Sequence, residues 1–158
     1  MADARLALAE RSLQRLADER GDVTDEVLAA YYARHPDARA SFQHHGLGET
    51  KALEARMVSE SLFLLLQWIE SPSTARIDHG TAITHHNDTM QIPPHWYLGL
   101  VDAALEILLG SIPANCAEER AMWLDLRGEF AGFVESLRKD FVYSDGGKPL
   151  PAFTPPDT

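Results

Sequence analysis

Apolar residues recur at helical spacing in two long segments of the second half of the chain, and this pattern restricts the fold more than any other feature. Residues 95–110, HWYLGLVDAALEILLG, directly follow a Pro-Pro pair and end at a glycine. In residues 117–143 the apolar stripe consists of Trp123, Leu126, Phe130, Phe133, Val134, Leu137 and Phe141. Apolar side chains three or four residues apart share one face of an α-helix. Each segment is therefore predicted to be a long helix that buries one face against other helices.

The first third of the chain contains shorter segments that glycine and proline separate. Leucines near helical spacing predict a first helix that ends before Gly21. Residues 24–34 are predicted to form a second helix, which must break at His35 because a residue before proline is disfavoured in a helix. A short turn over residues 36–42 and a glycine-containing loop over residues 44–49 are expected to follow.

The middle of the chain adds one strong and one weak helical segment. Residues 51–69 carry apolar side chains on more than one face and are predicted to form a long, well-buried helix. Residues 76–86 form a short helix of low propensity, which packing or a ligand must help to hold. No stretch alternates as a strand does. The prediction is an all-α fold of six to seven helices in a single domain over residues 1–143, with a Pro/Gly-rich tail over residues 144–158 that lacks regular structure.

The charge balance limits the classes of partner. The formal net charge of -10 repels polyanions, so neither nucleic acid nor an anionic membrane surface is an expected partner. The longest apolar run, residues 62–66, is too short to span a bilayer. A single cysteine, Cys116, excludes an internal disulfide and agrees with a reducing compartment, so a cytoplasmic location is expected. A small molecule or another protein is the expected partner.

Histidines are the distinctive chemical feature, since the sequence contains no phosphate-binding glycine loop, no Cys-x-x-Cys and no Gly-x-Ser-x-Gly. The seven are His35, His44, His45, His79, His85, His86 and His95. Three of them could hold zinc, but their spacings fit no common zinc pattern and no cysteine supports one. The adjacent pair His85 and His86 lies in the weak helical segment, six or seven residues before Ile92. Taken alone, this pair would be one solvent-facing and one half-buried residue of a helix.

Two strings place these histidines in a wider pattern. In YYARHPDARASF, an aromatic-rich helix ends at His-Pro, and Phe42 follows Pro36 by six residues. In HNDTMQIPPHW, a short helix is joined to a long apolar one through Ile92 and Pro93. Both strings resemble the globin family, which includes bacterial single-domain and sensor-type globins. The likeness extends over about residues 6–143, because the order of the helices matches as well, and it implies a globin-like domain that binds haem b.

The resemblance implies that His86 is the proximal ligand of the haem iron, with His85 in reserve. The shorter turn of bacterial flavohaemoglobins would instead place this position on Asn87, which cannot serve as a ligand. Adjacent residues of a helix point about 100° apart, so only one histidine can face the metal. The second ring nitrogen of the ligand must donate a hydrogen bond, either to Thr84 or to a carbonyl one turn earlier. One departure is Ala82, where the family usually has leucine.

The same resemblance assigns further contacts to the cofactor. Phe42 matches the phenylalanine that stacks on the haem, and Ile92 follows the proximal turn. Leu28 stands eight residues before Pro36, where many bacterial globins have a ligand-binding tyrosine. Tyr31 and Tyr32 are expected to face elsewhere and to pack between helices, with Tyr32 kept as a candidate haem contact.

The register of the long helix over residues 51–69 stays open. The possible pairs facing the iron from the distal side are Leu53 with Met57, Glu54 with Val58, and Met57 with Ser61, each at a four-residue spacing that shares one face. Most of these pairs give an apolar pocket. His44 and His45 are either solvated loop residues or contacts of the haem propionates, for which Arg56 is another candidate by charge.

The expected function is therefore a haem-binding globin that binds a diatomic gas, O2, CO or NO, at the iron held by His86. A distal side without a hydrogen-bond donor favours sensing or binding of gas over oxygen storage. Enzymatic activity is less expected, since the chain has no reductase domain. The alternatives are a globin-fold regulatory or interaction module that has lost haem, and a helical domain that binds another apolar ligand. A signalling partner and a homodimer through the last two helices are left open.

Overall fold

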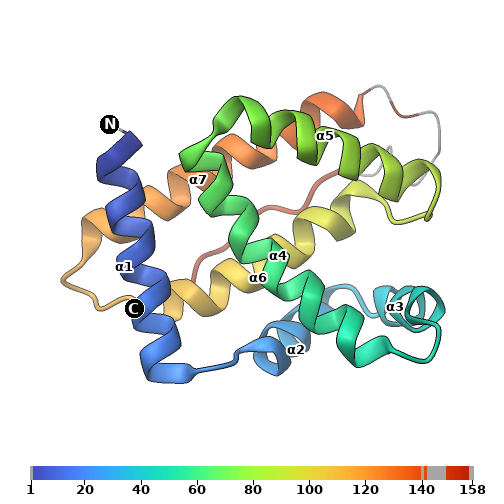
Figure 1. The fold of residues 1–158 in the computed structure, drawn as a ribbon, viewed down its shortest axis with the longest axis horizontal. Helices are drawn as coiled ribbons and strands as arrows, with labels where there is room; N and C mark the ends of the chain where they lie inside the picture. The colour runs from blue at the N-terminus through green and yellow to red at the C-terminus, as the bar shows by residue number, and fades with distance from the viewer. Residues whose placement is uncertain (1, 140, 142–148, 157–158) are drawn as a thin grey trace.

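Seven α-helices account for the regular structure of the chain in the computed structural model, which describes residues 2–139, 141 and 149–156 (Figure 1). They are α1 (Ala2–Arg20), α2 (Thr24–Arg34), α3 (Ala38–Gly46), α4 (Thr50–Glu70), α5 (Pro72–Asp88), α6 (Pro94–Gly110) and α7 (Ala117–Arg138). The described residues contain no strand. The predicted all-α, single-domain architecture is confirmed. No helix in this part of the chain has the length and apolar character needed to cross a bilayer.

Helix α3 occupies residues for which the sequence predicted a turn and the start of a loop, and that prediction was wrong. The segment begins Ala-Arg-Ala, which are good helix formers. The ring of Phe42 packs edge-on against Tyr31 and Tyr32 of α2, with ring centroids 6.3 and 6.1 Å apart. These contacts stabilise a helix that has no long apolar stripe of its own. It ends at Gly46, and the next residue, Leu47, has a left-handed φ of 48°.

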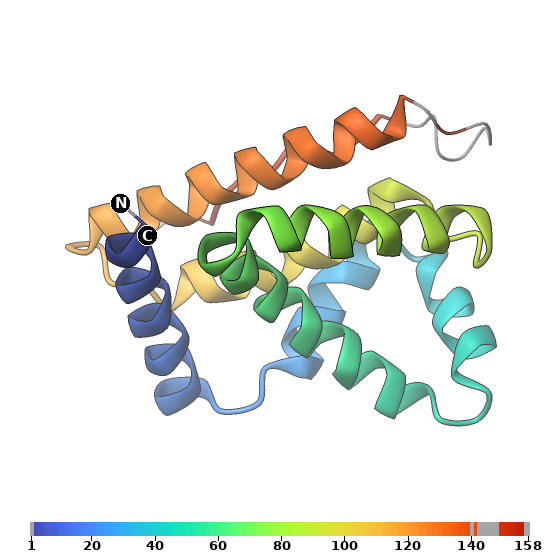
Figure 2. The same ribbon diagram turned by 45° about the horizontal axis from the view of Figure 1, so that its top comes forward.

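Helices α4 and α5 are separated by Ser71 alone. Pro72 begins α5 directly, because the first turn of a helix needs no backbone N–H from that residue. The weak helix predicted over residues 76–86 is therefore longer than expected at both ends. Helix α7 ends at Arg138, before the predicted limit of residue 143, and residues 142–143 lie outside the described part of the chain. Figure 2 shows α4 and α5 diverging from their junction toward α3.

Helix α6 lies at the centre of the core. It is buried along most of its length and packs against α2, α4 and α7. Helix α1 packs against α4 and α7, and the buried indole of Trp123 donates a hydrogen bond of 2.9 Å to the hydroxyl of Ser12, which fixes α7 on α1. Leu28 and Val58 both lie in this core. The space that remains between α4 and α5 is the site described below.

Residues 149–156 have no regular structure, as predicted for the tail, yet they pack on the helices. Arg127 donates a hydrogen bond of 2.9 Å to the carbonyl of Pro151, and its guanidinium lies 5.5 Å from the ring centroid of Phe153. Arg120 donates to the carbonyl of Pro156. Figure 1 shows this segment running back along α7 toward α1. The rest of the predicted tail, residues 144–148 and 157–158, lies outside the described residues.

Candidate functional site

A cavity of about 360 Å³ lies between α4 and α5, with α3 and α6 completing its walls. Its lining consists of Tyr31, Ser41, Phe42, His45, Leu53, Met57, Glu60, Ser61, Leu64, Gln67, Asp78, His79, Ala82, His86, Met90, Ile92, Trp96, Tyr97, Leu100 and Val101. Ligand pockets of proteins span about 300–1,000 Å³, so this cavity is at the small end of that range. It is apolar in the middle and polar at the end formed by α4 and the first half of α5.

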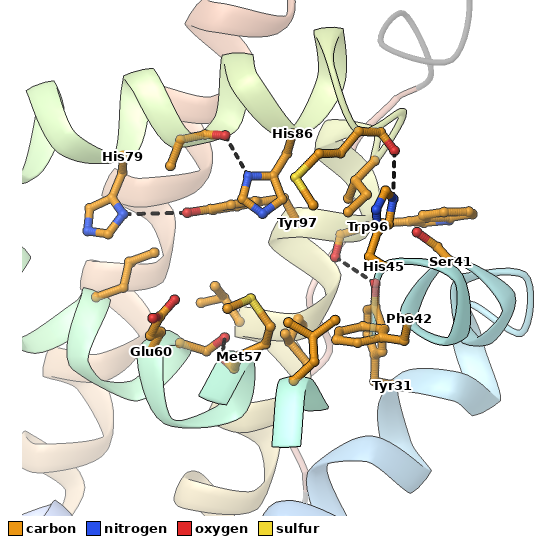
Figure 3. A pocket seen from close by; sticks show the side chains of 18 of the residues that line it. Tyr31, Ser41, Phe42, His45, Met57, Glu60, His79, His86, Trp96 and Tyr97 are labelled. Atoms are coloured by element: carbon orange, nitrogen blue, oxygen red, sulfur yellow. Dashed lines mark hydrogen bonds between the residues drawn. The ribbon is translucent and has the colours of Figure 1, made fainter. Parts of the chain in front are cut away.

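His86 projects from α5 into the cavity in a fixed orientation (Figure 3). Its Nδ1 lies 2.6 Å from the carbonyl oxygen of Ala82, one helical turn earlier. The sequence left two acceptors open for this ring, Thr84 and a backbone carbonyl one turn earlier, and in the structure the acceptor is the carbonyl. Nδ1 donates this hydrogen bond, which leaves the lone pair on Nε2 for the cavity. The ring of Tyr97 packs against the imidazole at right angles, with centroids 5.2 Å apart.

The environment of His86 keeps it neutral. Burial lowers the pKa of its imidazole, and the hydrogen bond to Ala82 opposes this effect only in part. A neutral imidazole has the free lone pair that a metal ion needs. The neighbouring His85 is exposed and does not line the cavity, so the two adjacent histidines occupy different environments, as expected for a helix.

Helix α4 supplies the wall opposite His86. Leu53, Met57, Ser61 and Leu64 face the cavity from this helix, and the Ser61 hydroxyl donates a hydrogen bond of 2.9 Å to the Met57 carbonyl. Two of the three candidate pairs, Leu53 with Met57 and Met57 with Ser61, therefore line the cavity. In the third pair, Val58 is a core residue and Glu54 accepts a hydrogen bond of 2.7 Å from the Tyr32 hydroxyl.

The end of the cavity near α3 brings together several of the residues proposed from the sequence. Phe42 and Ile92 line it, as does His45, whose Nε2 donates to the Met90 carbonyl over 3.1 Å. Tyr31 also lines it, contrary to the expectation that it faces elsewhere, and its hydroxyl donates to the Trp96 carbonyl. The other proposed contacts do not line the cavity: Leu28, Tyr32, Val58, His44 and Arg56.

A polar network lies at the opposite end of the cavity, and its residues were not predicted from the sequence. His79 Nε2 donates a hydrogen bond of 2.9 Å to the side-chain oxygen of Gln67, and the hydroxyl of Tyr97 lies 3.5 Å from His79 Nδ1. The Gln67 amide nitrogen donates to Asp78 over 3.0 Å. One signal was present in the sequence: His79 stands seven residues, two helical turns, before His86 and therefore shares its face. Figure 3 shows Glu60 beneath His79 at this end.

The lining of the cavity is acidic. It includes the carboxylates Glu60 and Asp78, and among the described residues that line the cavity none is lysine or arginine. Within the same part of the chain, no group of three or more His, Cys, Asp or Glu side chains is placed to hold a metal ion. The lining histidines His45, His79 and His86 therefore do not form a metal cage with the nearby carboxylates. Comparison of the chain with protein-family models, with curated proteins and with solved structures found no match.

Lowering the pH from about 7.5 to about 5.5 is expected to lower the free energy of unfolding of the protein without cofactor. Burial lowers the pKa of His35 and His79 below the ordinary value of 6.5. In this window the unfolded chain binds more protons than the folded protein, so stability present above pH 6.5 is lost as the pH falls toward the folded pKa values. Urea unfolding at the two pH values measures the loss, and His79→Gln should reduce it. An unchanged loss in the variant would contradict this explanation.

Proposed function

We propose that the protein is a haem-binding globin that holds haem b through His86 and binds a diatomic gas. The observation that carries this proposal is the orientation of His86: Nδ1 is bound to the Ala82 carbonyl, and the rest of the ring faces an apolar cavity. This is the arrangement by which proteins fix a neutral histidine as a metal ligand. When bound, haem supplies an iron atom that coordinates O2, CO or NO.

The arrangement of the helices supports a globin-like fold. The order of the helices follows the one noted in the sequence, except that α3 replaces the predicted turn and α5 is longer than the short helix expected there. Helix α6 is central, because α1, α2, α4, α5 and α7 all contact it. The turn after α5 places Ile92 at the cavity, six residues after His86.

The residues present fit the cofactor in most respects. Leu53, Leu64, Leu100 and Val101 give the cavity apolar walls, and Phe42 lines its α3 end. Haem also carries two carboxylates, for which the lining has no cationic partner of the lysine or arginine type. Ser41 and His45 at the α3 end are the groups that would hold them, and the acidic Glu60 and Asp78 at the other end would repel them.

Two of the hydroxyl groups that line the cavity already donate to backbone carbonyls. The Ser61 hydroxyl donates to the carbonyl of Met57, and the Tyr31 hydroxyl donates to that of Trp96. Neither proton is therefore available to a ligand in the cavity without breaking an existing hydrogen bond. Dioxygen gains most from a donor because charge develops on it, whereas CO depends on one far less. We therefore propose gas sensing or CO and NO binding in preference to oxygen storage.

Haemin is expected to bind at least about tenfold more tightly than iron-free protoporphyrin, because only haemin can bond to His86; contacts that merely support a metal-bound histidine already contribute 10–100-fold. Both affinities can be measured by quenching of tryptophan fluorescence. The two molecules share the same ring and the same carboxylates, so their difference isolates the metal–imidazole bond. Equal affinities would show that the cavity binds the ring through apolar contact alone and would contradict the role of His86.

The acidic end of the cavity favours a second candidate function. We propose as this alternative a haem-free regulatory module whose cavity takes another apolar ligand, one with a positively charged head near Glu60 and Asp78. Ala82, which stands one turn before His86 where globins usually have leucine, also favours this haem-free alternative. An alkylammonium ion that binds more tightly than the carboxylate of the same chain length, to a protein that takes up no haemin, would support this candidate over the first.

A further inference from the structure

The thioether of Met57 faces the same cavity as the imidazole of His86, from the opposite wall. Met57 lies in the second turn of α4, is half-buried and lines the cavity, and His86 lies near the end of α5. Figure 3 shows the two side chains on opposite sides of the space between these helices. A methionine sulfur is a soft, neutral donor, and iron in haem proteins accepts a Met/His pair of axial ligands.

We propose that Met57 is the second axial ligand of the haem iron, opposite His86. The proposal rests on the proposed function and deepens it, because a gas must then displace Met57 in order to bind. Haem would thus be bound between one residue of α4 and one of α5.

The other donors of the cavity are occupied or placed elsewhere. His45 and His79 lie at the two ends of the cavity, where their Nε2 atoms donate to the Met90 carbonyl and to the Gln67 side chain. The carboxylate of Glu60 belongs to an exposed residue and lies beneath His79 at the polar end (Figure 3). The hydroxyls of Ser61 and Tyr31 each donate to a backbone carbonyl. The thioether of Met57 is therefore the donor on the α4 wall that faces the middle of the cavity and is neither hydrogen-bonded nor exposed to solvent.

A thioether ligand has consequences that set it apart from a histidine or a carboxylate. Its sulfur is not protonated, so it stays available to the iron at any pH at which the protein is folded. A Met/His pair raises the reduction potential of haem. Two strong-field axial ligands also give a six-coordinate, low-spin iron. With these properties, gas binding by the protein would depend on the redox state of its iron.

The test compares the haemin-loaded wild-type protein with Met57→Leu and Met90→Leu. Both substitutions remove a thioether from the lining and nearly conserve volume. Electron paramagnetic resonance gives the ferric spin state, and a redox titration gives the potential. We expect low-spin iron in the wild type and in Met90→Leu, and high-spin iron with a lower potential in Met57→Leu. The apparent CO affinity should rise about tenfold or more in Met57→Leu, because a binding-competent state populated at about 10% or less weakens binding by that fraction.

The Met57→His variant distinguishes the loss of an iron ligand from a folding defect of Met57→Leu. It should restore low-spin iron at a lower potential than the wild type. High-spin iron in the wild type, or a spin state that Met57→Leu leaves unchanged, would overturn the role of Met57 while leaving His86 in place. Loss of the low-spin state in Met90→Leu alone would assign the ligand to Met90 and overturn it too. A wild-type protein that takes up no haemin would overturn the proposed function and this inference together.

Discussion

Replacing His86 by glycine is expected to weaken haemin binding by about 100-fold, and free imidazole is expected to restore most of the loss. The substitution removes the ring whose Nδ1 is bound to the Ala82 carbonyl and leaves a space of imidazole size in the cavity wall. A free imidazole can enter this space and bond to the iron from the same side. Titration with haemin, followed by absorption with and without imidazole, measures both effects.

His85→Gly is the matched control for this experiment. It lies on the same helix, and a glycine at either position costs roughly 1 kcal/mol of helix propensity. His85 is exposed and does not line the cavity, so its loss should leave haemin affinity within about twofold of the wild type. Equal losses in the two variants, or a His86→Gly protein that imidazole does not rescue, would mean that His86 supports the helix and not the cofactor.

Replacing Asp102 by alanine is expected to lower the free energy of unfolding by about 3–5 kcal/mol, the usual cost of removing one partner of a buried ion pair. Asp102 of α6 is buried and accepts two hydrogen bonds from Arg127 of α7, of 2.9 and 2.8 Å. Burial raises the pKa of Asp102 by more than Arg127 lowers it, so the pair as a whole contributes little. The single substitution nevertheless leaves a largely buried guanidinium without its carboxylate. Urea unfolding monitored by circular dichroism measures the change.

Two further variants make this prediction specific. Asp102→Leu combined with Arg127→Met should cost less than Asp102→Ala alone, because no unpaired charge remains. Glu129→Ala, which breaks the exposed pair with Arg5 on the surface of α7, should cost less than about 1 kcal/mol. A double variant that is less stable than the single one would show that the ion pair itself stabilises the contact of α6 with α7.

Local patterns in the sequence were enough to predict most of the helices. The bounds of α2 follow from its apolar spacing and from Pro36, and those of α6 from the Pro-Pro pair and Gly110. Helix α3 could not be predicted in this way, because it is stabilised by Phe42 packing on rings of α2 and has no long apolar stripe. The packing of residues 149–156 on Arg120 and Arg127 is likewise a long-range contact without a local signal.

The candidate site was predictable to the extent that it depends on spacing within one helix. His86 and His85 point in different directions because they are adjacent in a helix, and Met57 is accompanied by Leu53 and Ser61 at four-residue spacing. Which face of α2 reaches the cavity depends instead on how that helix crosses its neighbours. This is why Tyr31 lines the cavity and Leu28, one turn earlier, lies in the core.

Spacing within α5 places His79 on the same face as His86, but its partners at the polar end of the cavity could be found only in three dimensions. This end joins Gln67 of α4 to His79 of α5 and Tyr97 of α6, which are brought together by the single-residue connection at Ser71 and by the packing of α5 on α6. No spacing within one segment predicts this network. Its acidic neighbours Glu60 and Asp78 are also the feature that distinguishes the two proposed functions most clearly.

Titration of the purified protein with haemin, followed by gel filtration and absorption spectroscopy, tests the central claim most directly. If the cavity between α4 and α5 is a haem site, the protein saturates at one haem per chain, retains the cofactor through the column and shows an intense Soret band that changes when CO is added to the reduced form. A protein that leaves the column colourless, or that binds haemin without saturation, would contradict the proposal that this cavity holds haem.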